Sequence, residues 1–135
     1  MRNRELAKDY ARRAKVRLPV LDVLFDAESW PDVVRESQEI VDLALRAVLR
    51  SCGVDPPRTH DVSNVLLAER DRLPADLLAE VEWLAGVSRQ LRRDRELAFY
   101  GAEDLTPSEF YSRADAEEAR DFARRIVDLV FPQAG

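Results

Sequence analysis

The segment from Asp32 to Val65 contains the feature that most constrains the fold of this 135-residue chain. Its first part reads DVVRESQEIVDLALRAVLRSC, in which apolar side chains recur every three or four residues. That spacing places them on one side of a long α-helix. Gly53 follows, and glycine readily adopts the left-handed conformation that ends a helix. A Pro-Pro pair at 56–57 and a Thr-His-Asp step at 59–61 then lead toward the next helix.

The same periodicity predicts helices along the rest of the chain. They are expected at about 6–25, 30–52, 62–72, 77–100 and 113–131, with a further helical turn at 106–111. Ser29, Thr106 and Ser112 each stand three residues before an acidic side chain, a spacing that predicts caps at helix starts. Because the connections are short, we expect an all-α, antiparallel up-and-down bundle of four to five helices.

Composition agrees with a helical domain. Charged residues make up 35% of the chain and aromatic residues 7%, which is typical of helices with solvated faces. A chain of this length can bury its own core, so we expect one helical domain over residues 1–135, ordered from about 4 to 131. The lone Cys52, the lack of a run of about 20 apolar residues and the lack of a signal-peptide pattern predict a cytoplasmic protein outside the membrane.

The net charge of −5 argues against a broad surface for duplex DNA, which requires many Lys and Arg side chains to neutralise phosphates. Local basic clusters remain, one at residues 12–17 and one at residues 89–95. We interpret the first cluster as a solvated helix face. The second lies where the buried side of its helix becomes polar, and this is where we expect a site.

Residues that commonly hold metals are scarce. His60 and Cys52 are the only histidine and cysteine, and no ligand-spaced pair such as His-x-x-x-His occurs. We therefore expect no metal and no cofactor. Cys52 belongs to an apolar helical stripe, where a thiol behaves as a small apolar group rather than as a nucleophile.

The chain resembles the HEPN family of small helical domains. The resemblance rests on the long helix that ends at Gly53, the Pro-rich turn, the His60-Asp61 pair, the segment 97–101 and the Asp-Ala-Glu-Glu-Ala opening of the last helix. It implies a helical bundle that forms a homodimer. HEPN domains are commonly encoded beside, or fused to, minimal nucleotidyltransferases, which modify or restrain them in toxin-antitoxin pairs. The resemblance therefore implies such a partner, with Tyr100 as the candidate acceptor of a modification.

The ribonuclease members of the family carry an Arg, four to six further residues and then a His on a late helix. Residues 93–100 of this chain fit that frame, with Arg93 at its start and Ala98 where the His would stand. Cleavage of RNA in this way requires a side chain that transfers a proton, and alanine has no such group. The resemblance therefore favours a HEPN domain that acts as a binding module over one that acts as an enzyme.

Eight residues are candidates for binding a nucleotide or an RNA phosphate: Arg58, His60, Asp61, Arg92, Arg93, Arg95, Tyr100 and Gln38. The arginines of the fourth helix could hold phosphate by paired hydrogen bonds, or they could pair with neighbouring acidic residues. The residues at 58–61 stand beside a helix start that can receive an anion, or they could cap that helix and hold the Pro turn. Gln38 is expected to point inward.

One other charged pair stands in the long second helix. Asp42 and Arg46 have the spacing of a surface pair, which contributes only about 0.2 to 0.5 kcal/mol. We assign no site to them.

Three functions remain open at this point. The first is a non-catalytic, dimeric module that binds a nucleotide or RNA phosphate, or is regulated with a minimal nucleotidyltransferase in a toxin-antitoxin-like context. The second is a metal-independent ribonuclease that uses His60 as the base, with Arg93 and Tyr100 holding phosphate. The third is a purely structural or adaptor bundle. A fold alone does not choose among them.

Overall fold

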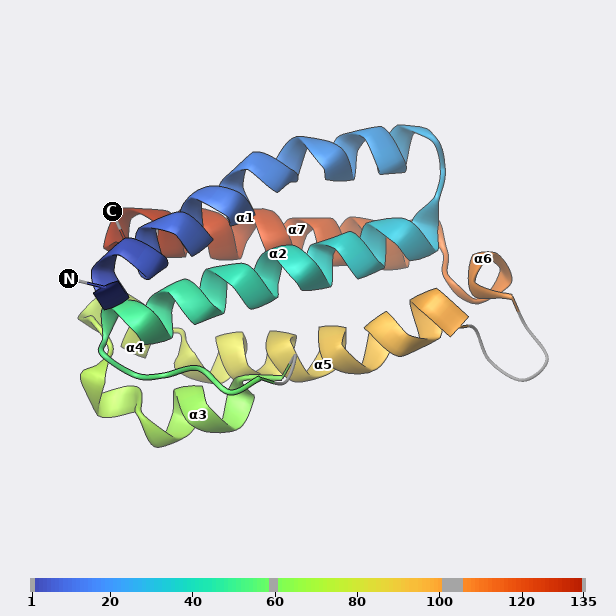
Figure 1. The fold of residues 1–135 in the computed structure, drawn as a ribbon. Coiled ribbons are helices and arrows are strands. Elements are labelled where there is room, and N and C mark those ends of the chain that lie inside the picture. The colour runs from blue at the N-terminus through green and yellow to red at the C-terminus, as the bar shows by residue number, and fades with distance from the viewer. Residues whose placement is uncertain (1, 59–60, 101–105, 135) are drawn as a thin grey trace.

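Four long helices run alternately up and down in the computed structural model, which describes residues 2–58, 61–100 and 106–134 (Figure 1). For residues 2, 95–100, 133 and 134 it describes the backbone alone. The long helices are α1 (Arg2–Asp26), α2 (Trp30–Ser51), α5 (Val81–Tyr100) and α7 (Arg113–Ala134). The short ones are α3 (Ser63–Ala68), the 3-10 helix η1 (Arg70–Arg72), α4 (Ala75–Leu78) and α6 (Pro107–Phe110). The described residues include no strand, and the predicted all-α bundle is confirmed.

Helix α2 is the centre of the bundle. It packs against α1, α5 and α7, and Figure 1 shows it between α1 and α5. Ile40, Leu45 and Leu49 on this helix are fully buried. Each such side chain contributes roughly 1.5 to 3 kcal/mol when it leaves water. The long amphipathic pattern in the sequence thus corresponds to the helix that organises the core.

Two of the three predicted caps are present. The hydroxyl oxygen of Thr106 accepts a hydrogen bond from the main-chain N–H of Glu109 at 3.3 Å. Ser112 and Asp115 cap α7 reciprocally, each accepting with its side chain from the main-chain N–H of the other, at 3.3 and 2.9 Å. At the end of α2, Gly53 has a φ of +77°, as predicted for the residue that stops this helix.

The third predicted cap is wrong. The hydroxyl of Ser29 donates to the carboxylate of Asp32 at 2.6 Å and accepts no hydrogen bond from the backbone. Pro31 contributes to this outcome because it has no N–H at one of the two positions that Ser29 could cap.

The chain between α2 and α5 is more broken than predicted. The third helix ends at Ala68 instead of continuing to 72, and Leu73 is extended. The ring of Pro74 disfavours a helical conformation in the residue before it, which accounts for the break. The predicted helix 77–100 is divided into α4 and α5. None of the helices in the described part of the chain combines the length and apolarity needed to cross a membrane.

Candidate functional site

The turn from α2 to α3 is fastened to α5 by hydrogen bonds. The hydroxyl of Ser88 on α5 donates to the carboxylate of Asp61 at 3.2 Å and accepts from the main-chain N–H of Val62 at 3.2 Å. The same carboxylate accepts from the main-chain N–H of Ser63 at 2.9 Å. Ser88 is only 4% exposed. Residues 61–63 therefore lie directly against α5.

Asp61 is an ionised group at neutral pH. Burial alone would raise the pKa of its carboxyl, but hydrogen bonds from Ser63 and Ser88 and the nearby Arg89 outweigh burial and lower the pKa below its usual value. The Nε of Arg89 also donates to the hydroxyl of Ser63 at 3.1 Å. The Asp61 carboxylate thus accepts from the first residue of α3, although the residue at the N-cap of this helix is Val62.

Helix α2 holds the other end of this turn. The guanidinium of Arg46 donates to the main-chain oxygen of Pro57 and, through Nε, to the carboxylate of Asp42 at 2.8 Å. The Asp42 and Arg46 side chains are only 9% and 14% exposed, so the interpretation of this pair as a surface pair is wrong. The pair is buried because the turn at Pro57 folds back over α2. Arg58, the next residue, is exposed.

One turn beyond Ser88, α5 presents two of the candidate arginines. Arg92 is half-buried and Arg93 is 73% exposed. The Nε of Arg93 lies 3.8 Å from the carboxylate of Asp94. Burial raises the pKa of Asp94, and Arg93 only partly offsets this effect. The exposed guanidinium of Arg93 is thus placed to meet an anion from solvent.

A buried tyrosine that the sequence did not single out supports this part of α5. The hydroxyl of Tyr111 donates to the main-chain oxygen of Asp94 at 2.9 Å, and Tyr111 is 5% exposed. Burial, followed by the negative charges of Asp94 and Asp115, raises the pKa of Tyr111, so the phenol remains a hydrogen-bond donor. The sequence did contain an indication that Tyr111 is buried. Tyr111 directly precedes the capping residue of α7, and an apolar side chain at that position often packs against the first turns of the helix.

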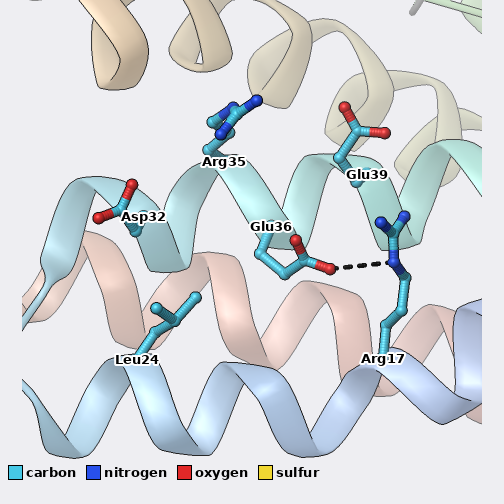
Figure 2. Close-up of a pocket in the computed structure, with 6 residues that line it drawn as sticks. All are labelled: Arg17, Leu24, Asp32, Arg35, Glu36 and Glu39. Carbon is cyan, nitrogen blue, oxygen red and sulfur yellow. Dashed lines mark ion pairs between the residues drawn. The ribbon is translucent and has the colours of Figure 1, made fainter.

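A groove of about 460 Å³ lies over α1 and α2 (Figure 2). Its lining consists of Arg17 and Leu24 from α1 and Asp32, Arg35, Glu36 and Glu39 from α2. The Nε of Arg17 lies 3.3 Å from the carboxylate of Glu36. Figure 2 shows Glu36 directed toward Arg17, whereas Arg35 and Glu39 point away from α1. The four α2 residues share one face of the helix because their spacing is i, i+3, i+4 and i+7.

Charge makes this groove unsuitable for phosphate. Three carboxylates in its lining outnumber two guanidinium groups. Burial raises the pKa of Glu36, Arg17 opposes the shift, and Glu39 adds to it. A positively charged side chain fits this environment better than an anion does. None of the predicted phosphate-binding residues lines it.

The structure describes the side chains of some predicted site residues and not of others. The structure brings Asp61 next to the α5 turn that precedes Arg92 and Arg93, and it places Gln38 on α2 with 2% exposure. His60 lies outside the described residues, as do the side chains of Arg95 and Tyr100. No group of three or more residues suited to hold a metal occurs within the described ranges.

Comparisons with known proteins agree with the resemblance seen in the sequence. A family model described as HEPN domain matches residues 7–133. A protein of Methanocaldococcus jannaschii described as a "Putative toxin" is 29% identical over 134 residues, which cover 95% of this chain and 88% of the relative. No solved structure matches the chain at a significant level.

Proposed function

Because the chain belongs to the HEPN domain family, we propose that it is a non-catalytic, dimeric member that binds nucleotide or RNA phosphate groups. We place it in a toxin-antitoxin-like setting with a minimal nucleotidyltransferase as partner. The setting is supported by the relative described as a toxin, which aligns with nearly the whole of this chain.

The observation that carries the proposal is the composition of α5. The helix runs unbroken from Val81 to Tyr100, and it carries Arg93 in an exposed position and Ala98 five residues later. An arginine can hold a phosphate by charged, paired hydrogen bonds. Without a group at position 98 that transfers a proton, the same helix lacks a component of the cleavage chemistry. Binding without cleavage is the function that these side chains support best.

The direct test is RNA cleavage by the purified chain beside an Ala98→His variant, which restores the Arg-x4-His spacing. We expect the parent to leave RNA intact and the variant to cleave it. Ala98→Gln is the matched control, because its amide is polar but cannot act as a base. Cleavage by the parent, or equal behaviour of the two variants, would contradict the proposal.

A metal-independent ribonuclease that uses His60 is the second candidate. The observation in its favour is the hydrogen bond from Ser88 to Asp61, the residue after His60, because Ser88 stands on the same helix as Arg92 and Arg93. If the parent cleaves RNA, His60→Ala should abolish that activity, with Asp55→Ala as a control in the same connection, since Asp55 is exposed and is not a candidate site residue. Full activity in His60→Ala would eliminate this candidate.

The proposed minimal nucleotidyltransferase partner is tested separately, by the mass of the intact chain. Co-expression with the minimal nucleotidyltransferase of a neighbouring gene should add the mass of one or more nucleotidyl groups to the intact chain. Tyr100→Phe should prevent this addition, whereas Tyr10→Phe should not. Addition that persists in Tyr100→Phe would assign the acceptor to another residue.

A further inference from the structure

Three valines form a continuous exposed row on α1. Val16, Val20 and Val23 are 56%, 42% and 68% exposed. They are four and three residues apart, so they are neighbours on one side of the helix. Buried residues such as Ala14 and Leu21 lie on the opposite side, since an α-helix turns about 100° per residue. Scattered apolar residues on a surface require no explanation, but a contiguous row marks a candidate contact surface.

The valine row borders the groove over α1 and α2. Val20 stands three residues after Arg17 and four before Leu24, which both line the groove, so it is a neighbour of both on the helix surface. Figure 2 shows Arg17 and Leu24 on the side of α1 that faces α2. The groove, at about 460 Å³, is as large as many ligand pockets and can admit side chains of a bound segment. The row and the groove therefore form one surface, here called the α1–α2 face.

The turn from α1 to α2, at one end of this face, is acidic. Residues 18–34 include four acidic residues and no Lys or Arg. Asp22 is engaged by Arg120 and Arg124 of α7. The other three are exposed and form no ion pair within the part of the chain that the structure describes: Asp26, Glu28 and Asp32.

The opposite end of the valine row is electrically balanced. Two acidic and two basic residues precede the valines on the outer side of α1, all exposed: Glu5, Asp9, Arg12 and Arg13. Lys15 is turned toward α7, where its ammonium group lies 4.1 Å from the centre of an aromatic ring. Lys8 stands two turns earlier on the same side of α1 as Lys15. The excess charge is therefore found only toward the turn.

Charges within the groove also offset one another in pairs, apart from Asp32. Arg17 lies 3.3 Å from the carboxylate of Glu36. Arg35 and Glu39 carry opposite charges, and Figure 2 shows both directed away from α1. The α1–α2 face as a whole is thus apolar along the valines and negatively charged beside the turn.

We propose that the α1–α2 face is a docking surface for a basic amphipathic helix of a partner protein. Apolar side chains of that helix would cover the valine row, in the manner of anchors spaced three and four residues apart. Its Arg or Lys side chains would meet the three unpaired carboxylates at the turn. Charge complementarity selects this occupant, because an acidic segment or an anionic lipid surface would be repelled.

The inference goes beyond the proposed function, because it requires neither phosphate binding at α5 nor modification of Tyr100. Figure 1 shows α1 and α5 on opposite sides of α2. A partner helix on the α1–α2 face would therefore lie apart from the exposed guanidinium of Arg93. The two surfaces can be tested independently.

Binding of designed peptides to the full chain tests the chemistry of the occupant. The probe is a labelled peptide of about 14 residues, roughly four helical turns, with leucine at every third or fourth position and arginine beside the leucines. One control peptide carries glutamate in place of arginine, and a second carries serine in place of leucine. By fluorescence anisotropy we expect the Arg/Leu peptide to bind at least tenfold more tightly than either control. Equal binding of the Arg and Glu peptides would overturn the proposal.

Variants of the chain test the location. Asp26→Asn with Glu28→Gln should weaken binding of the Arg/Leu peptide by roughly fivefold to tenfold. The matched control is Asp121→Asn with Asp128→Asn, which removes the same charge from exposed positions of α7 and should have little effect. An equal loss in the two double variants would show that the peptide responds only to the net charge of the chain, and would overturn the proposal.

The valine row has its own pair of variants. Val20→Ser should weaken peptide binding by about fivefold, whereas Leu78→Ser should not, although Val20 and Leu78 are 42% and 41% exposed. Thermal unfolding checks that all variants remain folded. Unchanged peptide binding by Val20→Ser would overturn the proposal. So would sedimentation velocity of the chain alone in which Val20→Ser dissociates a dimer, because the face would then be covered by a second copy.

Discussion

The carboxylate of Asp42 and the Nε of Arg46 lie 2.8 Å apart across one turn of α2, in a pair whose side chains are almost fully buried. The same guanidinium donates to the main-chain oxygen of Pro57. The pair therefore joins the central helix to the turn that leads into α3. When one member of a buried ion pair is removed, the other loses its counter-charge in a poorly solvated place, and the cost is large.

We expect Arg46→Ala to lower the free energy of unfolding by roughly 3 kcal/mol. Arg113→Ala is a matched control, because Arg113 pairs with Glu117 at the same helical spacing and 3.1 Å, but with side chains 66% and 49% exposed. Exposed pairs contribute about 0 to 1 kcal/mol. Urea unfolding followed by circular dichroism measures both changes. Equal losses in the two variants would show that burial does not set the contribution of the Asp42 pair.

Two buried serines should respond differently to replacement by alanine. Ser88→Ala leaves the main-chain N–H of Val62 without its acceptor and removes a donor to Asp61, so we expect a loss of roughly 1 to 3 kcal/mol in unfolding free energy. The hydroxyl of Ser37, a fully buried residue of α2, has no hydrogen-bond partner within the described part of the chain. Ser37→Ala should then change stability by less than about 0.5 kcal/mol. Thermal or urea unfolding that ranks Ser37→Ala as the more damaging change would contradict these assignments.

The pH dependence of stability should report the carboxyl of Asp61. Its pKa is lowered from 3.8 in the folded chain, so its contribution is present above that value and is lost as the pH falls through the folded pKa. Asp61→Asn should therefore be less stable than the parent at neutral pH, and the difference should shrink below about pH 4. Urea unfolding across this range measures the difference. A constant difference at every pH would mean that the charge of Asp61 has no part in holding the turn.

The sequence predicted the bundle because the features that specify it are local. The apolar period of α2 and the glycine that ends it lie within one segment, and the cap of α7 needs only Ser112 and Asp115. The burial of Asp42 could not be predicted in this way, because it depends on where the turn at Pro57 returns over α2. Spacing along a helix is the same for a surface pair and a buried pair.

The candidate site could likewise be predicted only where its features are local in the sequence. Arg93 could be selected because an Arg-rich helix is visible in the sequence, whereas the contact between Asp61 and Ser88 joins residues 27 positions apart. The division between α4 and α5 was also missed, since Ala79 and Glu80 are both good helix formers and mark no interruption. Long-range packing, rather than local preference, decides these features.

Alkaline pH should reveal the role of Tyr111. Its pKa is raised in the folded chain by burial and by Asp94 and Asp115, so its contribution is present below the unfolded value of about 10 and is lost as the pH rises above it. The parent should therefore lose stability more steeply than Tyr111→Phe above about pH 10, whereas near pH 7 Tyr111→Phe should be about 1 kcal/mol less stable. Urea unfolding at both pH values checks this, with Tyr10→Phe as the control. Parallel pH profiles for the parent and Tyr111→Phe would contradict the assignment.

The exposed guanidinium of Arg93 should contribute directly to the affinity for single-stranded RNA. We expect Arg93→Ala to weaken binding by roughly tenfold, and to reduce the slope of log affinity against log salt concentration by about 0.7, the value for one phosphate contact. Arg72→Ala is the matched control, because Arg72 is also exposed, at 57%, but lies in η1 before α4 and α5. Fluorescence anisotropy with labelled RNA at several salt concentrations measures both quantities. An unchanged salt slope in Arg93→Ala, or an equal loss in Arg72→Ala, would place the phosphate contact elsewhere on the chain.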